Sequence, residues 1–567
     1  MSKRPLSPAP LPVSKCRHTS SSSQAHTSLT INFDSALYDE VILQIFAHLS
    51  FVDLCAIQRT NRNWARLTLD NQLWKALYLA EYGRTRLRGG RGFIARTDGR
   101  EVKALPGRAK EKAHAQADDA KDWKWMFRIS SNWRRGRCSI QHLDESIERP
   151  FPPSLSGTLA AGAIKRGTCV ILAGNLTITA SSIPSTTPSI HVLSSTQQRA
   201  TLVAGSSQST AATHVTTLAL DQSPPGGISS QTSRLVCFLS TGEFSVFRLH
   251  HSNPSSSSKL FTYIPTRQHA RTSPIIQAVY HHPLLVTLSE SFHLSIYDLS
   301  VEGKVRLCQT LTSFTSYPPS SLVLSTPSPS TYKLVLAYAV HVYPSHYSVG
   351  ATELIVSAAE DMAVTSTRTT RAIDVPNGWI DEEKLRTMRE QWGRKVASVA
   401  DTQTDGKWVV LAPGDSSLWR PLSANESSSS DSDSSTLSGT SYRSSAFYSD
   451  STLQLYRLHL PSPAHASASP RLTFVRSLHG QIGPISALAL ADGRCVSMGV
   501  NGSIWVWDLE AGTGAEVAEG VAFLNGEGGE SAVDRSVMVG ATGSVAFDER
   551  RIVSAGVEGV QVRRFDI

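Results

Sequence analysis

Apolar residues are unusually dense in one stretch near the amino end of the chain, LYDEVILQIFAHLSFVDL at residues 37–54. If residues 41–49 form an α-helix, its apolar side chains point in nearly every direction, whereas a helix at a protein surface normally has one apolar stripe. We therefore expect the apolar side chains of this helix to be buried from two directions, by neighbouring helices on one side and by another surface on the other.

Three further short helices are predicted before residue 80. Ser50 and Asp53 have the spacing of a capping box, and Asn61 can cap the helix that contains Trp64. A fourth helix follows Asp70. Four such helices make a thin domain that is marginally stable alone, so a partner surface would complete its core.

From residue 138 onward the pattern changes to short, β-rich runs separated by Ser, Gly, Pro and Asn, which is typical of a sandwich, a barrel or a propeller. One unit recurs, in which a turn is followed by an alternating strand that ends in an aromatic residue. These aromatic residues are Phe247, Tyr297, Tyr456, Trp507 and Phe565. With less clear units near 155–195 and 321–357, the estimate is seven units, and six or eight remain compatible with the pattern.

The helical stretch resembles an F-box. The positions that carry the resemblance are Leu37, Glu40, Ile42, Ile45, Phe46, Leu49, Asp53, Leu54, Trp64, Leu73 and Trp74. The family usually has a proline after the first leucine, where this chain has Tyr38, and the adaptor contact could be tighter or looser as a result. A helical bundle that packs only on its own chain is the alternative.

The resemblance implies an all-α F-box that binds a Skp-type adaptor and, through it, a cullin ubiquitin ligase. The residues expected to contact the adaptor are Leu37, Ile42, Ile45, Phe46, Leu49, Leu54, Trp64, Leu73 and Trp74.

Residues 478–512 resemble a WD repeat, which is one four-stranded blade of a β-propeller. The family has a hydrogen-bonded chain of side chains across the blade, and the matching residues here are His479, Ser497, Asn501 and Trp507. Two departures stand out: His479-Gly480 reverses the usual Gly-His order, and Asn501 replaces the turn aspartate. Because an amide has no charge, we expect it to hold the histidine less firmly. The network is structural, and no chemistry is assigned to it.

Closure of the ring is predicted from the last unit, which reaches residue 567 at its third strand. The segment RCSIQHLD at 137–144 precedes the first unit and alternates suitably. We expect it to pair with the last unit and to remove an exposed strand edge. The expected fold class is therefore multidomain: a small all-α F-box, followed by an all-β propeller of WD-repeat type with seven blades.

Composition limits the class of protein. The chain has 567 residues, seven widely spaced cysteines and a formal net charge of +8. It has no apolar stretch long enough for a membrane span and no signal peptide at its start. We therefore expect a soluble chain with reduced thiols, located in the cytoplasm, the nucleus or both.

The basic charge is concentrated between residues 84 and 137, which hold 16 Lys/Arg and 6 Asp/Glu. A solvated linker is favoured over an electrostatic patch for nucleic acid or an acidic partner. Trp123, Trp125, Phe127 and Trp133 lie in its last part, where aromatic rings with arginines could stack on bases. The phrase Asn132-Trp133-x-x-Gly136-x-Cys138 resembles the junction of F-box propeller proteins, so packing at that junction is favoured over nucleic-acid contact.

Two insertions interrupt the propeller pattern. Residues 413–449 are Ser-rich and are expected to form a disordered loop between the second and third strands of a blade; they are either a tolerated insertion or a set of phosphorylation sites. Residues 374–395 predict a short exposed helix with Trp379, Leu385, Met388 and Trp392 near one face. This helix either packs on the propeller or contacts a partner.

No catalytic, cofactor or metal motif is present. The pairs His250-His251 and His281-His282 are adjacent, and neighbours along a strand point to opposite faces, so neither pair suits a metal ion. A non-enzymatic role is expected.

The domains are expected as follows: a disordered tail at 1–30, the F-box at 31–80, a basic linker at 81–137 with a helix near 118–130, and the propeller at 138–567. The favoured function is the substrate receptor of a Skp–cullin–F-box ubiquitin ligase, with the propeller presenting an unidentified protein target, phosphorylated or not, for degradation. The alternative is a non-ligase scaffold whose basic linker contacts nucleic acid or an acidic partner.

Overall fold

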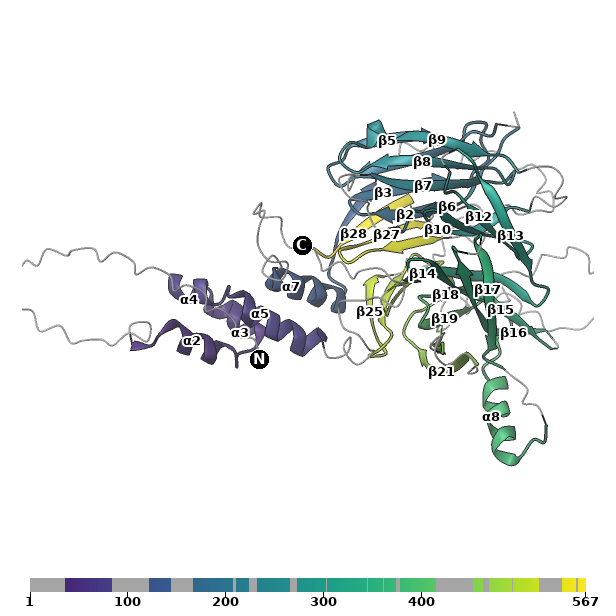
Figure 1. The fold of residues 1–567 in the computed structure, drawn as a ribbon. Helices are drawn as coiled ribbons and strands as arrows, with labels where there is room; N and C mark the ends of the chain where they lie inside the picture. The colour runs from purple at the N-terminus through teal and green to yellow at the C-terminus, as the bar shows by residue number, and fades with distance from the viewer. Residues whose placement is uncertain are drawn as a thin grey trace, which may run out of the picture. The chain divides into compact units, whose positions relative to one another are not determined.

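The computed structural model divides the chain into two units, Met1–Ala76 and Leu77–Ile567 (Figure 1). The expected tail at 1–30, most of the basic segment and nearly all of the insertion at 413–449 lie outside the described residues. The residues described are 36–83, 122–143, 167–207, 211–223, 232–265, 273–414, 452–461, 469–519 and 543–567, without 302, 344, 360, 374–377, 492, 557 and 558. Among these residues, no helix has the length and apolarity to cross a bilayer.

The first unit is built from short helices whose starts are capped as the sequence predicts. The helices are α2 (Asp39–Phe46), α3 (Phe51–Ile57), α4 (Arg62–Leu67) and α5 (Asn71–Tyr78), the last of which runs into η1 (Leu79–Gly83). The Ser50 hydroxyl accepts a hydrogen bond from the Asp53 amide at 3.3 Å, and the Asn61 side chain accepts one from the Trp64 amide at 2.7 Å. Both predicted caps are confirmed.

Aromatic contacts hold these helices together. The rings of Phe46 and Trp64 meet edge to face with centroids 5.8 Å apart. The Trp74 indole is buried and donates to the Thr68 carbonyl oxygen at 2.7 Å. Rings of this size contribute most of the apolar area that so small a core can bury.

The second unit contains seven four-stranded antiparallel sheets. The first three sheets are formed by β2 (Thr168–Ala173), β3 (Leu176–Ser181), β4 (Ser189–Ser194) and β5 (Arg199–Val203); by β6 (Val215–Leu220), β7 (Thr232–Leu239), β8 (Phe244–His250) and β9 (Ser258–Tyr263), with η3 (Pro254–Ser256) before β9; and by β10 (Ile275–His281), β11 (Leu284–Ser289), β12 (His293–Asp298) and β13 (Arg306–Thr312).

The remaining sheets include one with unusually long strands. They are formed by β14 (Ser316–Ser328), β15 (Thr331–Val342), β16 (His346–Ser357) and β17 (Ala363–Arg371); by β18 (Val399–Thr404), β19 (Trp408–Pro413), β20 (Leu453–His459) and β21 (Arg471–Leu478); by β22 (Ile485–Ala491), β23 (Arg494–Gly499), β24 (Ile504–Asp508) and β25 (Thr513–Ala518); and by β26 (Ser544–Phe547), β27 (Arg551–Gly556), β28 (Gly559–Arg564) and β1 (Ser139–Leu143).

These sheets close into a seven-bladed propeller. The first strand of each sheet lies beside the first strand of the next, and β26 of the seventh sheet lies beside β2 of the first. We number the blades 1 to 7 in this order, from β2–β5 to the sheet that contains β26. Figure 1 shows the yellow strands β27 and β28 next to the blue β2. The expected fold class and the count of seven are confirmed.

The seventh blade is completed by the segment that precedes the first. Strand β1 pairs antiparallel with β28, with Ser139 opposite Arg564 and Leu143 opposite Val560. The predicted closure by residues 137–144 is therefore confirmed. Because β1 pairs with the edge of β28, that edge has no row of unpaired backbone N–H and C=O groups with which another chain could pair.

Buried aromatic residues mark the third strands, as the sequence pattern predicts. Phe247, Tyr297, Tyr456, Trp507 and Phe565 are all buried. The first four pack in apolar clusters formed by neighbouring blades, whereas Phe565 stacks on Trp133 of the preceding helix. The fold therefore depends on this apolar alternation in blades that lack the WD signature.

The polar network of blade 6 differs from the prediction at one position. The Trp507 indole donates to the Ser497 hydroxyl at 2.8 Å, as expected, but the Ser497 hydroxyl donates to Gln481 at 2.5 Å rather than to His479. The Gln481 amide then donates to the Ser503 hydroxyl at 3.1 Å. Assigning His479 to the network was wrong.

The reversed His-Gly order explains why Gln481, and not His479, occupies the histidine's place in the network. His479 directly follows β21 and is exposed, with its Nδ1 3.4 Å from the Thr452 hydroxyl. Two residues later the chain has turned inward, and the fully buried Gln481 has both the acceptor and the donor that the two serines require. Asn501 does not hold a histidine either, because its side chain accepts from the Ser503 amide at 3.1 Å.

The insertion between β17 and β18 contains helix α8 (Glu382–Trp392). The Asp381 side chain caps it by accepting from the Lys384 amide at 2.8 Å. No residue of α8 is buried, so the predicted exposed helix is confirmed.

Candidate adaptor and target interfaces

Helix α2 has two apolar faces. Ile42 and Phe46, four residues apart, are buried, with exposed fractions of 0% and 2%. Tyr38, Val41 and Ile45 follow one another at spacings of three and four, which places them on a single face, and they are 81%, 44% and 41% exposed. The second face explains the dense apolar pattern of the sequence, and no described residue of the first unit buries it.

Two more apolar side chains of the first unit are exposed. Val52, in the first turn of α3, is 58% exposed, and Leu69, between α4 and α5, is 57% exposed. Single exposed apolar residues need no explanation, but several within one small domain indicate an interaction surface. We name Tyr38, Val41, Ile45 and Val52 the outward face of the F-box helices.

The structure separates the predicted adaptor residues into three groups by exposure. Ile45 is exposed, whereas Leu37, Leu49 and Trp64 are half-buried. The others are buried and pack inside the protein, so they can support an adaptor contact only indirectly: Ile42, Phe46, Leu54, Leu73 and Trp74. Sequence reasoning missed Val41 as a site residue, although its position four residues before Ile45 places it on the same face.

The junction helix α7 (Trp123–Arg134) is fastened to blade 7 by its last turn. The Asn132 amide donates to the Phe565 carbonyl oxygen at 2.9 Å, and the Trp133 indole donates to the Glu549 carbonyl oxygen at 3.0 Å. Glu549 lies between the first and second strands of its blade, and Phe565 follows the third. We call this end of the propeller, where first and second strands connect, the α7 end.

Further contacts fix the same junction. The Arg494 guanidinium lies over the Trp133 ring, 5.1 Å from its centroid. Gly136 has a φ of +65°, and a Cβ there would collide with the Glu516 carbonyl oxygen, so only glycine suits this close approach. Because Trp123 and Trp133 are buried, their rings are not free to stack on bases, and packing at the junction is confirmed.

Exposed aromatic rings gather at the opposite end of the propeller. Phe314 lies between β13 and β14 and is 89% exposed, Tyr343 lies between β15 and β16 and is 81% exposed, and Trp379 lies between β17 and β18 and is 88% exposed. Tyr317, at the start of β14, is partly exposed as well. These connections all leave the end away from α7, and we name the four residues the aromatic rim.

Two family models match the chain. The F-box-like model covers residues 39–80, and the model of the F-box protein pof12 beta-propeller covers residues 185–553, more than half of the chain. The chain belongs to the F-box protein pof12 beta-propeller family. As an F-box propeller protein, it joins the short helical F-box region to the seven blades described above.

One curated relative is an F-box protein of Saccharomyces cerevisiae, which is 27% identical over 132 residues. This match covers 22% of the chain and 21% of the relative, so the chain spans about a fifth of that protein's length.

Similar solved structures include Saccharomyces cerevisiae Sqt1, with 9% identity, a TM-score of 0.34, and coverage of 70% of this chain and 94% of that one. The C-terminal WD40 domain of Sif2 has 10% identity, a TM-score of 0.34, and coverage of 70% and 80%.

Three thiols of this F-box propeller protein, those of Cys169, Cys237 and Cys495, are poor nucleophiles. Burial raises the pKa of the Cys169 thiol to about 11, and it also raises the pKa of Cys237 and Cys495. A thiol with a raised pKa stays protonated at neutral pH, and the thiolate is the reactive form. Within the described ranges, no three His, Cys, Asp or Glu residues are grouped so that they could hold a metal ion.

Proposed function

We propose that the chain is the target-recognition subunit of a Skp–cullin–F-box ubiquitin ligase, which acts in the cytoplasm, the nucleus or both. The outward face of the F-box helices is the observation that carries this proposal. It consists of Tyr38, Val41 and Ile45 at helix α2, whose other face already forms the core, and of Val52 on α3. A Skp-type adaptor that covers the outward face would supply the missing partner.

The size of the contact supports a specific role for this face. Val41, Ile45 and Val52 are aliphatic, and fully burying one such side chain contributes about 1.5–3 kcal/mol. A helix that presents apolar residues at spacings of three and four fits the groove of a partner protein. Replacing two of these residues by aspartate would bury charge without a partner, which no adaptor surface of this kind tolerates.

The propeller would hold the target. The aromatic rim is the largest group of exposed rings described on it, and aromatic residues supply many of the strongest contacts in protein interfaces. Ubiquitin transfer would be carried out by a recruited conjugating enzyme. This chain would contribute proximity and orientation, which alone convert a bimolecular encounter into a much faster step.

A nucleic-acid scaffold is the competing function. It would use the basic segment 84–137 as its main contact. Trp123 and Trp133 pack inside the protein, and this removes two of the rings that base stacking would require.

The test is capture of a Skp-type adaptor by the full chain on co-expression. We expect stoichiometric capture by the parent chain and loss of capture by the double variant Val41→Asp, Ile45→Asp. The matched control is Val203→Asp, because Val203 is 55% exposed on β5 of the propeller and the change is chemically the same. The control should capture the adaptor like the parent.

Two results would overturn the proposal. One is failure of the parent chain to capture any Skp-type adaptor; the other is full capture by the double variant. Salt-sensitive binding of the parent to nucleic acid, together with failure to capture an adaptor, would favour the competing function.

A further inference from the structure

A cavity of about 190 Å³ lies between blades 2 and 3. His282 enters it from the connection between β10 and β11, and Leu299 enters it just after β12. These connections belong to the α7 end of the propeller. The cavity is therefore separate from the aromatic rim, which lies at the other end, and no motif in the sequence points to it.

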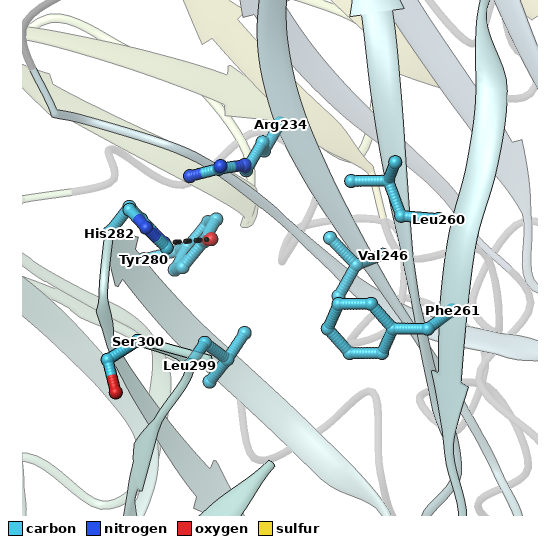
Figure 2. A pocket seen from close by; sticks show the side chains of 8 residues that line it. All are labelled: Arg234, Val246, Leu260, Phe261, Tyr280, His282, Leu299 and Ser300. Atoms are coloured by element: carbon cyan, nitrogen blue, oxygen red, sulfur yellow. Dashed lines mark hydrogen bonds between the residues drawn. The ribbon is translucent and has the colours of Figure 1, made fainter. Parts of the chain in front are cut away.

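One side of the cavity is polar and carries a positive charge. Figure 2 shows the Arg234 guanidinium beside the Tyr280 hydroxyl and the His282 ring. Arg234 hydrogen-bonds to the Tyr280 hydroxyl, which lies 3.1 Å from Nδ1 of His282. Among the described residues, Arg234 makes no ion pair.

The Arg234 guanidinium carries the charge on this side. Burial raises the pKa of the Tyr280 hydroxyl, so it stays protonated. Burial, followed by the Arg234 charge, lowers the pKa of His282, so its imidazole is neutral at pH 7, and one hydrogen bond joins its Nδ1 to the Tyr280 hydroxyl. Asp221, His281 and Asp298 also act on His282, and the Asp221 carboxylate is occupied by the His282 amide at 3.0 Å.

The other side of the cavity is apolar. In Figure 2, Val246, Leu260 and Phe261 lie across from the polar groups, and Leu299 lies below them. The volume is well under the roughly 300–1,000 Å³ of sites for drug-sized ligands. A single residue of a protein is therefore a better match than a cofactor.

We propose that this cavity binds the C-terminal residue of a protein partner, with the carboxylate against Arg234 and the side chain against Val246, Leu260 and Phe261. An internal Asp or Glu has only a short apolar part and would leave the apolar side unfilled. A phosphate brings about −1.5 to −2 charge and three acceptor oxygens, and sites for it normally use several arginines. A C-terminal residue has one carboxylate and a complete side chain, which matches one guanidinium facing an apolar side.

The inference deepens the proposed function, because it makes a free C-terminus a recognition element of the ligase target. Binding to the cavity can nevertheless be measured without an adaptor. Failure of this inference therefore leaves the adaptor proposal untouched, and the reverse also holds.

The test uses the full chain and four small probes in ligand-observed saturation-transfer NMR: N-acetylleucine, N-acetylleucinamide, N-acetylglycine and phenyl phosphate. We expect N-acetylleucine to bind about tenfold or more tightly than its amide, because the amide lacks the charge-assisted hydrogen bond to Arg234. N-acetylglycine should bind more weakly than N-acetylleucine, because it has no side chain for the apolar side.

Variants then locate the binding. Arg234→Met should remove the preference for the acid over the amide. Lys259→Met is the matched control. It removes the same charge from β9, at the residue next to the lining residue Leu260, and Lys259 pairs with Phe247 rather than with the lining residue Val246. The control should keep the preference.

Equal binding of acid and amide by the unaltered chain would overturn the inference without any variant. A preference for the acid that survives Arg234→Met would also overturn it. Tighter binding of phenyl phosphate than of N-acetylleucine would identify a phosphate site instead and would likewise contradict a C-terminal residue as the ligand.

Discussion

The indole ring of Trp133 stacks on the phenyl ring of Phe565, with centroids 4.0 Å apart and ring planes inclined by 15°. Trp133 lies in the last turn of the helix that precedes the first blade, and Phe565 follows the third strand of the last blade. One stacked pair therefore joins the junction helix to the blade where the ring closes, and the adjacent β1 completes that blade.

Replacing Trp133 by alanine should lower the free energy of unfolding of the propeller by about 3–5 kcal/mol, the usual range for a buried tryptophan. The variant loses the stack and the hydrogen bond to the Glu549 carbonyl oxygen. Urea denaturation followed by tryptophan fluorescence measures the change. Trp379→Ala is the control, because this ring is 88% exposed and its loss should change the value by no more than about 0.5 kcal/mol.

Removing β1 should leave the outer edge of blade 7 unpaired. A chain that starts at residue 138 retains β1, whereas a chain that starts at residue 145 exposes the edge of β28. We expect the shorter chain to have a lower melting temperature and to aggregate with increasing concentration, since an unpaired edge recruits other strands. Equal melting temperature and solubility for the two chains would contradict the role of β1.

In the blade 6 network, Gln481 makes the contacts that were predicted for His479, and variants of the two residues can test this. Gln481→Ala should lower the free energy of unfolding by about 1–3 kcal/mol, because it leaves the buried Ser497 and Ser503 hydroxyls without their partner. His479→Ala should have little effect, since this side chain is exposed. Urea denaturation of both variants checks the assignment, and a larger loss for His479→Ala would reverse it.

Stability should fall with acidification below neutral pH. Burial lowers the pKa of His214, His282 and His459 from the ordinary value of 6.5, so the folded chain binds fewer protons than the unfolded chain. Their contribution is present above pH 6.5 and is lost as the pH falls towards the lowered folded pKa values.

The free energy of unfolding should therefore be smaller at pH 5.5 than at pH 7.5. His282→Gln should reduce this difference, because glutamine does not titrate and can still accept a hydrogen bond from Tyr280. An unchanged pH dependence in the variant would show that His282 is not among the groups responsible.

Several features could be predicted from the sequence because they depend on local patterns. The two-sided apolar character of α2 follows from the spacing of Val41, Ile42, Ile45 and Phe46. The closure by β1 follows from counting strands in units of four. What the pattern could not decide was which of these apolar residues face inward, because that depends on the contact of Phe46 with Trp64, far along the chain.

Other features had no local signal. The buried place of Gln481 depends on how the chain turns after β21, and a motif comparison favours the nearby His479. The cavity between blades 2 and 3 joins Arg234, Leu260 and His282 from three separate strands or connections. In the sequence, each of these looks like an ordinary strand or turn residue.

We expect a Skp-type adaptor to cover the outward face of the F-box helices. Amide hydrogen exchange across residues 39–57, measured with and without a Skp-type adaptor, detects such a contact on the helices themselves. Exchange in α2 and α3 should be slower when the adaptor is present, with no change in strands β2 to β5 of blade 1. Unchanged exchange across both helices at saturating adaptor would contradict it.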